Sequence, residues 1–412
     1  MTIKYYQKIG AGALLYIFQA CTFSSPSVPP SANGRTVEDE RTDSIVLSYD
    51  PAKADKQVDV FINKLHEEEG FNGCVLVAKG GKIIYEKAIG WADYQHRDSL
   101  KINSRFELAS LTKPFTATAI LMLAQDGKLN LDQDVKEFFP NFPYDGITIK
   151  LLLSHRSGMM NYVYFTDSIW RAEHRDKRKG ISNMDVMNLI AEYKPKPFSK
   201  PDRGFHYNNS NYMVLAAIIE KISGKSYPEF MQEHIFKPCG MKNTAVYSKA
   251  VYDQIPVDVV GHDRVWKYAV VQNFLDGPVG DKGIYSTIED MYLFDRAMRK
   301  GKLLTKANLD LAYTPRNAML NGHFNYGYGW RTFEGYGHKV VYHTGWWHGF
   351  NHIYLRDISK DMTIVLLSNL TNRSLRQLDE LYKIAGMPVI RKSAYTKDGE
   401  EQLIIETEVG DE

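Results

Sequence analysis

A serine and a lysine three residues apart, Ser110 and Lys113, stand at the start of an apolar segment. Positions i and i+3 are neighbours on a helix surface, so a helix beginning here would hold the hydroxyl beside the amine. The N-terminal end of a helix carries partial positive charge and unpaired N–H groups, which stabilise a developing anion. A serine becomes a useful nucleophile when a base takes its proton, and a lysine with a lowered pKa can be that base. The pair therefore indicates nucleophilic attack on a carbonyl group.

The same two residues have an ordinary structural interpretation, in which Ser110 caps a helix and Lys113 is a solvated side chain. So short a pattern is common in sequences. Two further motifs follow in the order that the chemistry would need, and they argue against chance. The segment Tyr207-Asn208-Asn209 precedes an apolar run at 213–222, and the triplet at 343–345, His-Thr-Gly, lies in a predicted strand.

Together the three motifs resemble those of the serine β-lactamase and penicillin-binding-protein superfamily, whose signatures include Ser-x-x-Lys and Lys-Thr-Gly. The Tyr-x-Asn form of the middle motif resembles the class C-like branch, which also holds D-aminopeptidases, DD-peptidases and esterases. The segments at 151–158 and 280–287 resemble this branch as well, and the resemblance covers roughly residues 53 to 385. It implies a β-lactamase-related serine hydrolase that forms an acyl-enzyme on an ester, a D-amino-acid amide or peptide, or a β-lactam, without a cofactor.

The resemblance implies a role for each residue of the first two motifs. Ser110 would attack the carbonyl carbon, and either Lys113 or Tyr207 would be the general base, a choice that the sequence leaves open. A tyrosine has an ordinary pKa near 10, so Tyr207 needs cationic neighbours to be a base near pH 7, and Lys113 and His343 are the candidates for that role. Asn209 is expected to hydrogen-bond Lys113 and the substrate amide. The alternatives are a half-buried aromatic ring for Tyr207 and a helix cap for Asn209.

The third motif is expected to bind substrate through His343, Thr344, Gly345 and the next residue, Trp346. The backbone N–H groups of Ser110 and Trp346 would form the oxyanion hole. His343 departs from the lysine that is common here in β-lactamases, whose fixed charge helps to hold the substrate carboxylate. A histidine with a pKa near 6.5 is mostly neutral at pH 7, which argues against an efficient β-lactamase. The alternative is a strand histidine without a role.

Aromatic residues near the motifs are expected to line a cleft that favours an apolar acyl or aryl group, although about half of them would belong to the core. The loop at 155–158 is expected to be structural and to approach the site by its backbone. The aromatic set is Tyr162, Tyr164, Phe165, Trp346, Trp347, His348 and Phe350.

Composition excludes several other classes of protein. The chain has 412 residues and a formal net charge of +2, which gives no case for a nucleic-acid partner. The histidines do not cluster with Cys, Asp or Glu at metal-ligand spacing, and the Gly-x-Ser-x-Gly elbow of α/β-hydrolases is absent. We therefore expect a small-molecule or peptide substrate and no metal, and the sequence does not indicate an oligomeric state.

Residues 1–20 are predicted to be a signal peptide of the lipoprotein type. Lys4 and Lys8 precede an apolar run at 9–18 that is too short to span a bilayer as a mature helix. Cleavage would leave Cys21 lipidated at the new N-terminus, followed by a flexible tether to residue 50. Phe18 and Gln19 differ from the usual residues before such a cysteine, so ordinary signal-peptidase cleavage is the alternative. This predicts a protein exported to the bacterial cell envelope (periplasmic or an outer-membrane lipoprotein), with membrane contact only through the lipid.

Residues 51–388 are predicted to form the hydrolase domain, followed by a C-terminal tail at 389–412. Strand patterns flank a Gly80-Gly81 turn near the start of the domain and recur at 324–332, 339–345, 350–356 and 362–369. Helical patterns lie between them, including one at 213–223, and a last helix is predicted at 374–384. The polar and basic residues 165–200 are predicted to be a loop-and-helix insertion. This predicts an α+β fold, in which a central antiparallel β-sheet is flanked by helices and carries an inserted, mostly helical subdomain. Cys74 and Cys239 are expected to be free and packed.

Two alternatives to an exported hydrolase remain at this stage. The chain would otherwise be a non-catalytic or slowly turning over penicillin-binding-like envelope protein, or a transacylase. Acylation without turnover would distinguish the first, and partitioning to an added alcohol or amine would distinguish the second.

Overall fold

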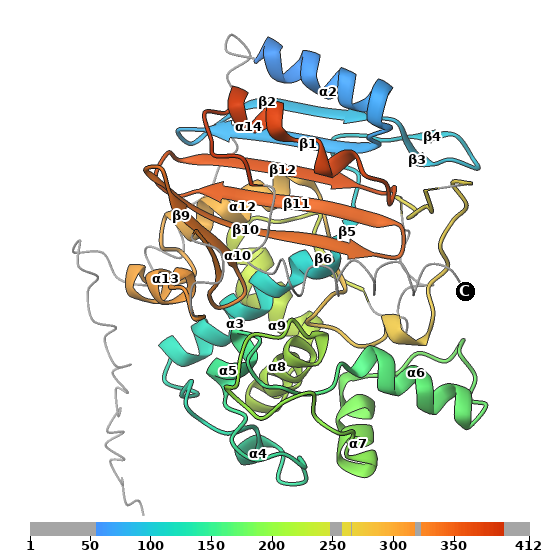
Figure 1. Cartoon of the computed structure of the whole chain (residues 1–412), viewed down its shortest axis with the longest axis vertical. Coiled ribbons are helices and arrows are strands. Elements are labelled where there is room, and N and C mark those ends of the chain that lie inside the picture. Colours follow the sequence, from blue (N-terminus) through green and yellow to red (C-terminus); the bar gives the residue numbers. More distant parts are fainter. Residues whose placement is uncertain (1–54, 248–257, 265, 318–322, 391–412) are drawn as a thin grey trace, which may run out of the picture.

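The computed structural model describes residues 55–247, 258–264, 266–317 and 323–390 (Figure 1). The predicted signal peptide, Cys21, the tether and nearly all of the C-terminal tail lie outside these ranges. Within the described ranges, no helix is both long enough and apolar enough to cross a membrane.

The strands form one large sheet and two small ones. The large sheet has the order β2-β1-β12-β11-β10-β9-β8, β3 pairs with β4, and β7 lies between β5 and β6. The bounds are β1 Gly73–Lys79, β2 Lys82–Ile89, β3 Trp91–Asp93, β4 Asp98–Ser99, β5 Phe106–Glu107, β6 Ala245–Val246, β7 Ile284–Ser286, β8 Phe324–Tyr326, β9 Arg331–Gly335, β10 His338–Trp347, β11 Phe350–Asp357 and β12 Met362–Ser368.

Most helices lie between the N-terminal and C-terminal strands in the sequence. The α-helices are α2 Lys56–Glu69, α3 Thr112–Gln125, α4 Val135–Phe138, α5 Ile149–Leu153, α6 Tyr162–Ala172, α7 Asn183–Tyr193, α8 Asn209–Ser223, α9 Tyr227–Met231, α10 Lys237–Cys239, α12 Ile288–Arg299, α13 Lys306–Tyr313 and α14 Asp379–Ile384. The 3₁₀ turns among the described residues are η2 Ala109–Leu111, η4 Phe274–Asp276 and η5 Ser374–Arg376, and η3 Gln232–Phe236 is a π-helical turn.

The large sheet joins the two ends of the domain. β1 pairs with β12 in antiparallel register from Gly73↔Ser368 to Lys79↔Met362. β1 also pairs with β2 through the predicted glycine turn, where Gly80 and Gly81 have φ of 57° and 77°. The prediction of an α+β fold with one antiparallel sheet built from both ends of the chain is confirmed.

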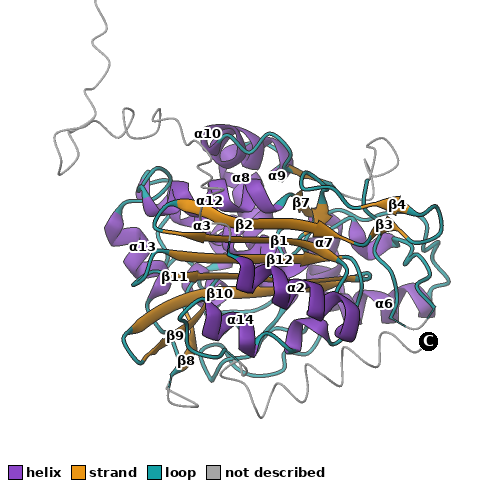
Figure 2. Ribbon diagram, turned by 90° about the horizontal axis from the view of Figure 1, so that it is seen from above, coloured by secondary structure: helices purple, strands orange, loops and turns teal. Residues whose placement is uncertain are grey.

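Alternation of side chains along the central strands divides the interior into two cores. On β1, Cys74 and Leu76 face one core, while Val75 and Val77 face the other. Because both faces are covered, β1 is buried along nearly its whole length. The smaller core is closed by α2 and α14, which lie across the strands in Figure 2.

The larger core contains the helices that come from the middle of the chain. Helix α3 has a buried run from Thr112 to Leu123, as expected for a helix surrounded by protein. It packs against α8, and the two helices lie below the sheet in Figure 1, with α6 and α7 farther out. The predicted loop-and-helix insertion at 165–200 contains most of α6 and all of α7, with loops at 173–182 and 194–200.

Several predicted elements differ from the observed ones in detail. The segment at 324–332 is two strands, because Gly329 adopts a left-handed φ of 80° in the turn between them. The helix predicted at 213–223 begins at Asn209, since Asn208 caps it with its side chain on the Ser210 N–H. The helix predicted at 374–384 begins only at Asp379, after a 3₁₀ turn. Cys74 and Cys239 are free and buried.

Candidate functional site

Ser110 lies in the 3₁₀ turn η2, which leads directly into α3. The preceding residue, Ala109, has a left-handed φ of 49°, a conformation that costs a non-glycine residue roughly 1–2 kcal/mol. Two backbone hydrogen bonds hold this bend, from Leu108 N to Ile284 O at 2.7 Å and from Leu111 N to Leu108 O at 2.9 Å. The bend leaves Ser110 half-buried between fully buried neighbours. Strain held in this way at one residue is typical of functional sites.

Lys113, on the first turn of α3, is fully buried, and its Nζ has three partners. The nitrogen lies 2.8 Å from Ser110 Oγ, 2.9 Å from Asn209 Oδ1 and 3.1 Å from the Asp281 carbonyl oxygen. Burial lowers the pKa of Lys113 from 10.5 to about 7. A neutral amine has two donors and one lone pair. It can donate to Asn209 and Asp281 while its lone pair accepts the Ser110 proton.

The second motif reaches this amine from the start of α8. Asn208 fixes the helix start, accepting from Ser210 N at 2.9 Å and donating through Nδ2 to Met159 O at 2.6 Å. Asn209 is then the first helical residue, and its Oδ1 is directed at Lys113. The predicted contact between Asn209 and Lys113 is therefore present, and the capping role falls on Asn208 instead.

Tyr207 is half-buried and has cationic groups near its ring. Lys113 Nζ lies 4.9 Å from the ring centroid, and Arg331 Cζ lies 5.5 Å from it. Cations near an aromatic face are attracted by its electron density. The His155 ring packs at 4.3 Å from the Tyr207 ring. The centroids of the Tyr207 and His343 rings are 6.2 Å apart, so Tyr207 lies near both Lys113 and the third motif.

His343 begins the third motif on β10, and its environment corrects one prediction. The ring is fully buried, with Nδ1 at 2.7 Å from Thr344 O and Nε2 at 3.2 Å from the Tyr326 hydroxyl. Burial, assisted by Arg331 and Lys113, holds the pKa of His343 well below its usual range. His343 is therefore neutral and does not supply a cation to Tyr207. Arg331 is the cation at this position.

Gly345 lets the third motif approach the nucleophile. A Cβ at this position would lie 2.4 Å from the Leu108 carbonyl oxygen, so no larger residue fits without moving the backbone. The contact brings β10 against η2, two residues from Ser110. The neighbours of Gly345 are accessible, with Thr344 exposed and Trp346 half-buried.

Arg331 and His155 are site neighbours that the sequence analysis missed. Arg331 is 4% exposed and pairs with Tyr342 on β10, one residue from His343. His155 was assigned to a loop that approaches by its backbone, but its side chain is fully buried against the site. Its Nδ1 lies 3.1 Å from the Asn208 N and 3.0 Å from Asn211 Nδ2. The sequence did not indicate that these two residues lie near the site, because strand register and tertiary packing bring them there.

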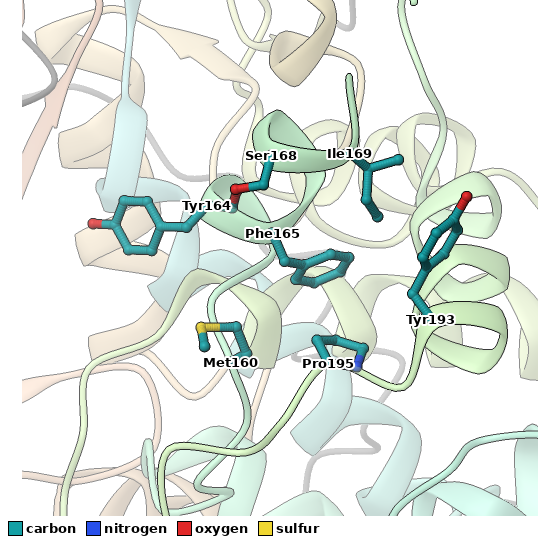
Figure 3. Close-up of a pocket in the computed structure, with 7 residues that line it drawn as sticks. All are labelled: Met160, Tyr164, Phe165, Ser168, Ile169, Tyr193 and Pro195. Atoms are coloured by element: carbon teal, nitrogen blue, oxygen red, sulfur yellow. The ribbon is translucent and has the colours of Figure 1, made fainter. Parts of the chain in front are cut away.

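The residues of the predicted aromatic cleft fall into two groups in the structure, one in the core and one at a cavity. Tyr162 is fully buried and Phe350 is 4% exposed, so both belong to the core. Tyr164 and Phe165 line a cavity of about 330 Å³ between α6 and the end of α7 (Figure 3). Its other lining residues are Met160, Ser168, Ile169, Tyr193 and Pro195. The cavity is adjacent to the second motif, because Ser210 Oγ donates to the Met160 carbonyl oxygen at 2.8 Å.

Within the described ranges, no group of three or more His, Cys, Asp or Glu could hold a metal ion.

Comparison with known proteins agrees with this geometry. The sequence model of the Beta-lactamase family matches residues 58–386. The chain belongs to the β-lactamase family. A curated relative, penicillin-binding protein 4* of Bacillus subtilis, is 34% identical over 329 residues, covering 76% of this chain and 71% of the relative. The putative penicillin-binding protein PbpX of the same organism is 29% identical over 318 residues, covering 76% of this chain and 74% of that protein.

Solved structures share the fold of this β-lactamase-family chain. A penicillin-binding protein from Bacillus halodurans superposes with a TM-score of 0.69 at 24% identity, covering 79% of this chain and 98% of that one. A D-amino acid amidase from Ochrobactrum anthropi superposes with a TM-score of 0.65 at 21% identity, covering 81% and 98%. The chain is a serine hydrolase of the β-lactamase and penicillin-binding-protein superfamily.

Proposed function

We propose that this chain hydrolyses an amide bond of a D-amino acid, in a free amide or a peptide, through an acyl-enzyme on Ser110. The observation that carries the proposal is the buried Lys113 amine, 2.8 Å from Ser110 Oγ and with a pKa of about 7. A base poised near neutral pH is what activation of a serine hydroxyl requires. Esters would be accepted by the same machinery, because their carbonyl carbon is more easily attacked.

In the proposed reaction, Ser110 Oγ bonds to the carbonyl carbon while its proton passes to Lys113. The resulting oxyanion is held by the backbone N–H groups of Ser110 and Trp346. Collapse of the tetrahedral intermediate breaks the C–N bond, and the proton is returned to the leaving amine through Lys113 or Tyr207. A water molecule then attacks the ester and regenerates the Ser110 hydroxyl. Asn209 and Thr344 would orient the substrate.

The choice of a D-amino-acid amide over a β-lactam rests on His343 and on the relatives. His343 is neutral, so this motif lacks the fixed charge that a lysine would offer to a β-lactam carboxylate. The structural relatives include an enzyme named D-amino acid amidase, and two of the curated relatives are named penicillin-binding proteins. The competing proposal is a penicillin-binding-like protein that is acylated but turns over slowly.

The experiment is a comparison of D- and L-phenylalanine amide, a p-nitrophenyl ester and a cephalosporin, with intact-mass measurement of the protein during each reaction. We expect kcat/KM to be highest for the D-amide and the ester, with the cephalosporin leaving a long-lived adduct. Faster turnover of the cephalosporin than of the D-amide would contradict the proposal. A persistent adduct with every substrate would favour the slowly turning over alternative.

We also propose that residues 1–21 direct export and that Cys21 carries a lipid at the cell envelope. The basic start, the short apolar run and the cysteine support this proposal. A Cys21→Ser variant is expected to leave the membrane fraction for the soluble fraction in cell fractionation. Equal membrane association of both forms would contradict lipid anchoring at Cys21.

A further inference from the structure

The end of β10 that carries Trp346 has a neighbouring strand on only one side. β9 pairs with β10 from His338 to Tyr342, whereas β11 pairs with it as far as Trp347. The strands β10 and β11 are joined by a two-residue turn, His348-Gly349, with φ of 43° and 82°. Such a turn closes a hairpin tightly but does not fix the hairpin tip relative to the rest of the protein. Contacts beyond the sheet must do that.

Asp276, at the end of η4, makes such contacts with Trp347, the last residue of β10, and with His348, the first residue of the turn. Its Oδ1 accepts a hydrogen bond from Trp347 Nε1 at 2.6 Å, and its Oδ2 lies 3.3 Å from His348 Nδ1. Oδ2 also accepts from the Asn273 N–H at 2.6 Å, which ties the carboxylate to its own turn. Asp276 is 5% exposed, so its hydrogen bonds with Trp347 and Asn273 are shielded from water.

The charges around Asp276 favour its ionised form. Burial opposes ionisation, but His348 and Lys282 outweigh it and hold the pKa of Asp276 below its usual value. Lys282 Nζ lies 5.2 Å from the centroid of the Trp347 ring and so packs against the same indole. Burial raises the pKa of Glu107 to about 8, and the negative charge of Asp276 adds to this shift. Protonation of Glu107 limits the repulsion between the two carboxyl groups near neutral pH.

The backbone near Gly261 holds the tip from a second direction. A Cβ at Gly261 would lie 2.0 Å from the His348 carbonyl oxygen, and a Cβ at Gly349 would lie 2.2 Å from His262 N. The segment at 261–262 and the turn at 348–349 therefore touch backbone to backbone. The tip is fixed by this contact together with the Asp276 carboxylate.

We infer that Asp276 is a positioning residue for catalysis, which acts through the Trp347 indole and His348 to hold the Trp346 N–H where the oxyanion forms. The inference rests on the proposed acyl-transfer function. A displacement of about 1 Å in such a group can cost on the order of 100-fold in rate. Because the substrate ground state places less charge on its oxygen than the transition state does, the effect should fall mainly on the transition state.

The test compares Asp276→Ala, Asp276→Asn and Trp347→Phe with the wild type, using the favoured substrate and phenylboronic acid. The boronic acid forms a tetrahedral adduct on an activated serine, with an oxygen at the oxyanion position. We expect Asp276→Ala and Trp347→Phe each to lower kcat and weaken boronate inhibition by about 10- to 100-fold, with a much smaller change in KM. Asp276→Asn, whose amide oxygen can still accept the indole bond, should recover part of the loss.

Two further variants separate positioning from general stability. The double variant Asp276→Ala, Trp347→Phe should lose little more than the larger single effect, since both changes remove one interaction. Asp290→Asn is the matched control, because Asp290 is also buried and accepts from Asn243 N at 2.8 Å and Thr244 Oγ1 at 2.7 Å. This control should leave boronate inhibition unchanged. Each protein is checked by thermal unfolding, and if Asp276→Ala does not fold, the other two site variants still decide the question.

Boronate inhibition and kcat within about twofold of wild type in Trp347→Phe and in a folded Asp276 variant would overturn the inference. A rise in KM with unchanged boronate inhibition would overturn it as well. Failure of the wild-type protein to form any boronate or substrate adduct would instead contradict the proposed function itself. The two failures are therefore distinguishable.

Discussion

Replacement of Ser110 by alanine is expected to reduce kcat by about 10⁴-fold or more, because removal of a catalytic nucleophile leaves only binding and oxyanion stabilisation. The variant should fold normally, since Ser110 is half-buried and Lys113 keeps its contacts with Asn209 and Asp281. Intact mass after exposure to a fluorophosphonate probe is the measurement. The wild type should gain one adduct, and Ser110→Ala should gain none.

A matched control for this experiment is Ser223→Ala, at the end of α8. Ser223 Oγ donates to the Ile219 carbonyl oxygen at 2.7 Å and makes no contact with the candidate site. Its loss should leave both labelling and turnover unchanged. Labelling of the Ser110→Ala protein at the wild-type rate would show that another residue is the nucleophile.

The second large effect is expected at Lys113. Lys113→Met keeps the length and apolar stem of the side chain but removes the base, and general-base catalysis typically contributes about 10²- to 10⁴-fold. Lys113→Arg should not restore activity, because a guanidinium does not lose its proton in proteins. Rapid-mixing measurement of Ser110 acylation by an ester would report this step directly. Acylation at near the wild-type rate in Lys113→Met would identify Tyr207 as the base.

The pH dependence of acylation follows from the same residue. With a pKa of about 7, Lys113 is protonated at lower pH and accepts a proton only at higher pH. The wild-type acylation rate should therefore rise with pH through about 7 and then level off. The Lys113→Met protein should lack this rise, and its persistence there would assign the titration to another group.

The free energy of unfolding should also depend on pH above about 7, and it should increase as the pH rises. Burial lowers the pKa of Lys113 from 10.5 in the unfolded chain to about 7, so between these values the unfolded state binds more protons. The free energy of unfolding of the wild type is therefore expected to gain a contribution as pH rises from about 7 towards 10.5. Denaturation at pH 7 and pH 9 should show a smaller gain for Lys113→Met. This comparison checks the pKa without using activity.

The sequence predicted those parts of the site that depend on local geometry. The spacing of Ser110 and Lys113 predicted that the two side chains would be neighbours, and Lys113 Nζ lies 2.8 Å from Ser110 Oγ. The predicted contact of Asn209 with Lys113 is present at 2.9 Å. Strand alternation predicted the antiparallel sheet, since each strand had to present side chains to one face or the other. The position of Ser110 in a strained 3₁₀ turn was not predicted, because a left-handed alanine carries no sequence signal.

The electrostatics of the site could not be predicted from the same residues. His343 was expected to offer a cation to Tyr207, but burial removes its charge and Arg331 supplies it instead. Arg331 reaches the site only through the register Tyr342↔Arg331. Asp276 contacts the hairpin through a hydrogen bond with Trp347, which lies 71 positions later in the chain. Such proximities depend on tertiary packing, which spacing along the chain does not encode.

The pairing of β1 with β12 has a consequence for the timing of folding. Gly73 lies opposite Ser368 in the register, so the middle of the sheet forms only after almost the whole domain has been synthesised. Pairings of such high contact order form slowly, because the loop-closure entropy must be paid before the contacts contribute. The part of β10 that packs beside Ser110 also takes its place in the sheet late, for the same reason. A growing chain therefore carries its nucleophile for most of its synthesis without a working active site, and hydrolytic activity begins only when both ends of the domain have met.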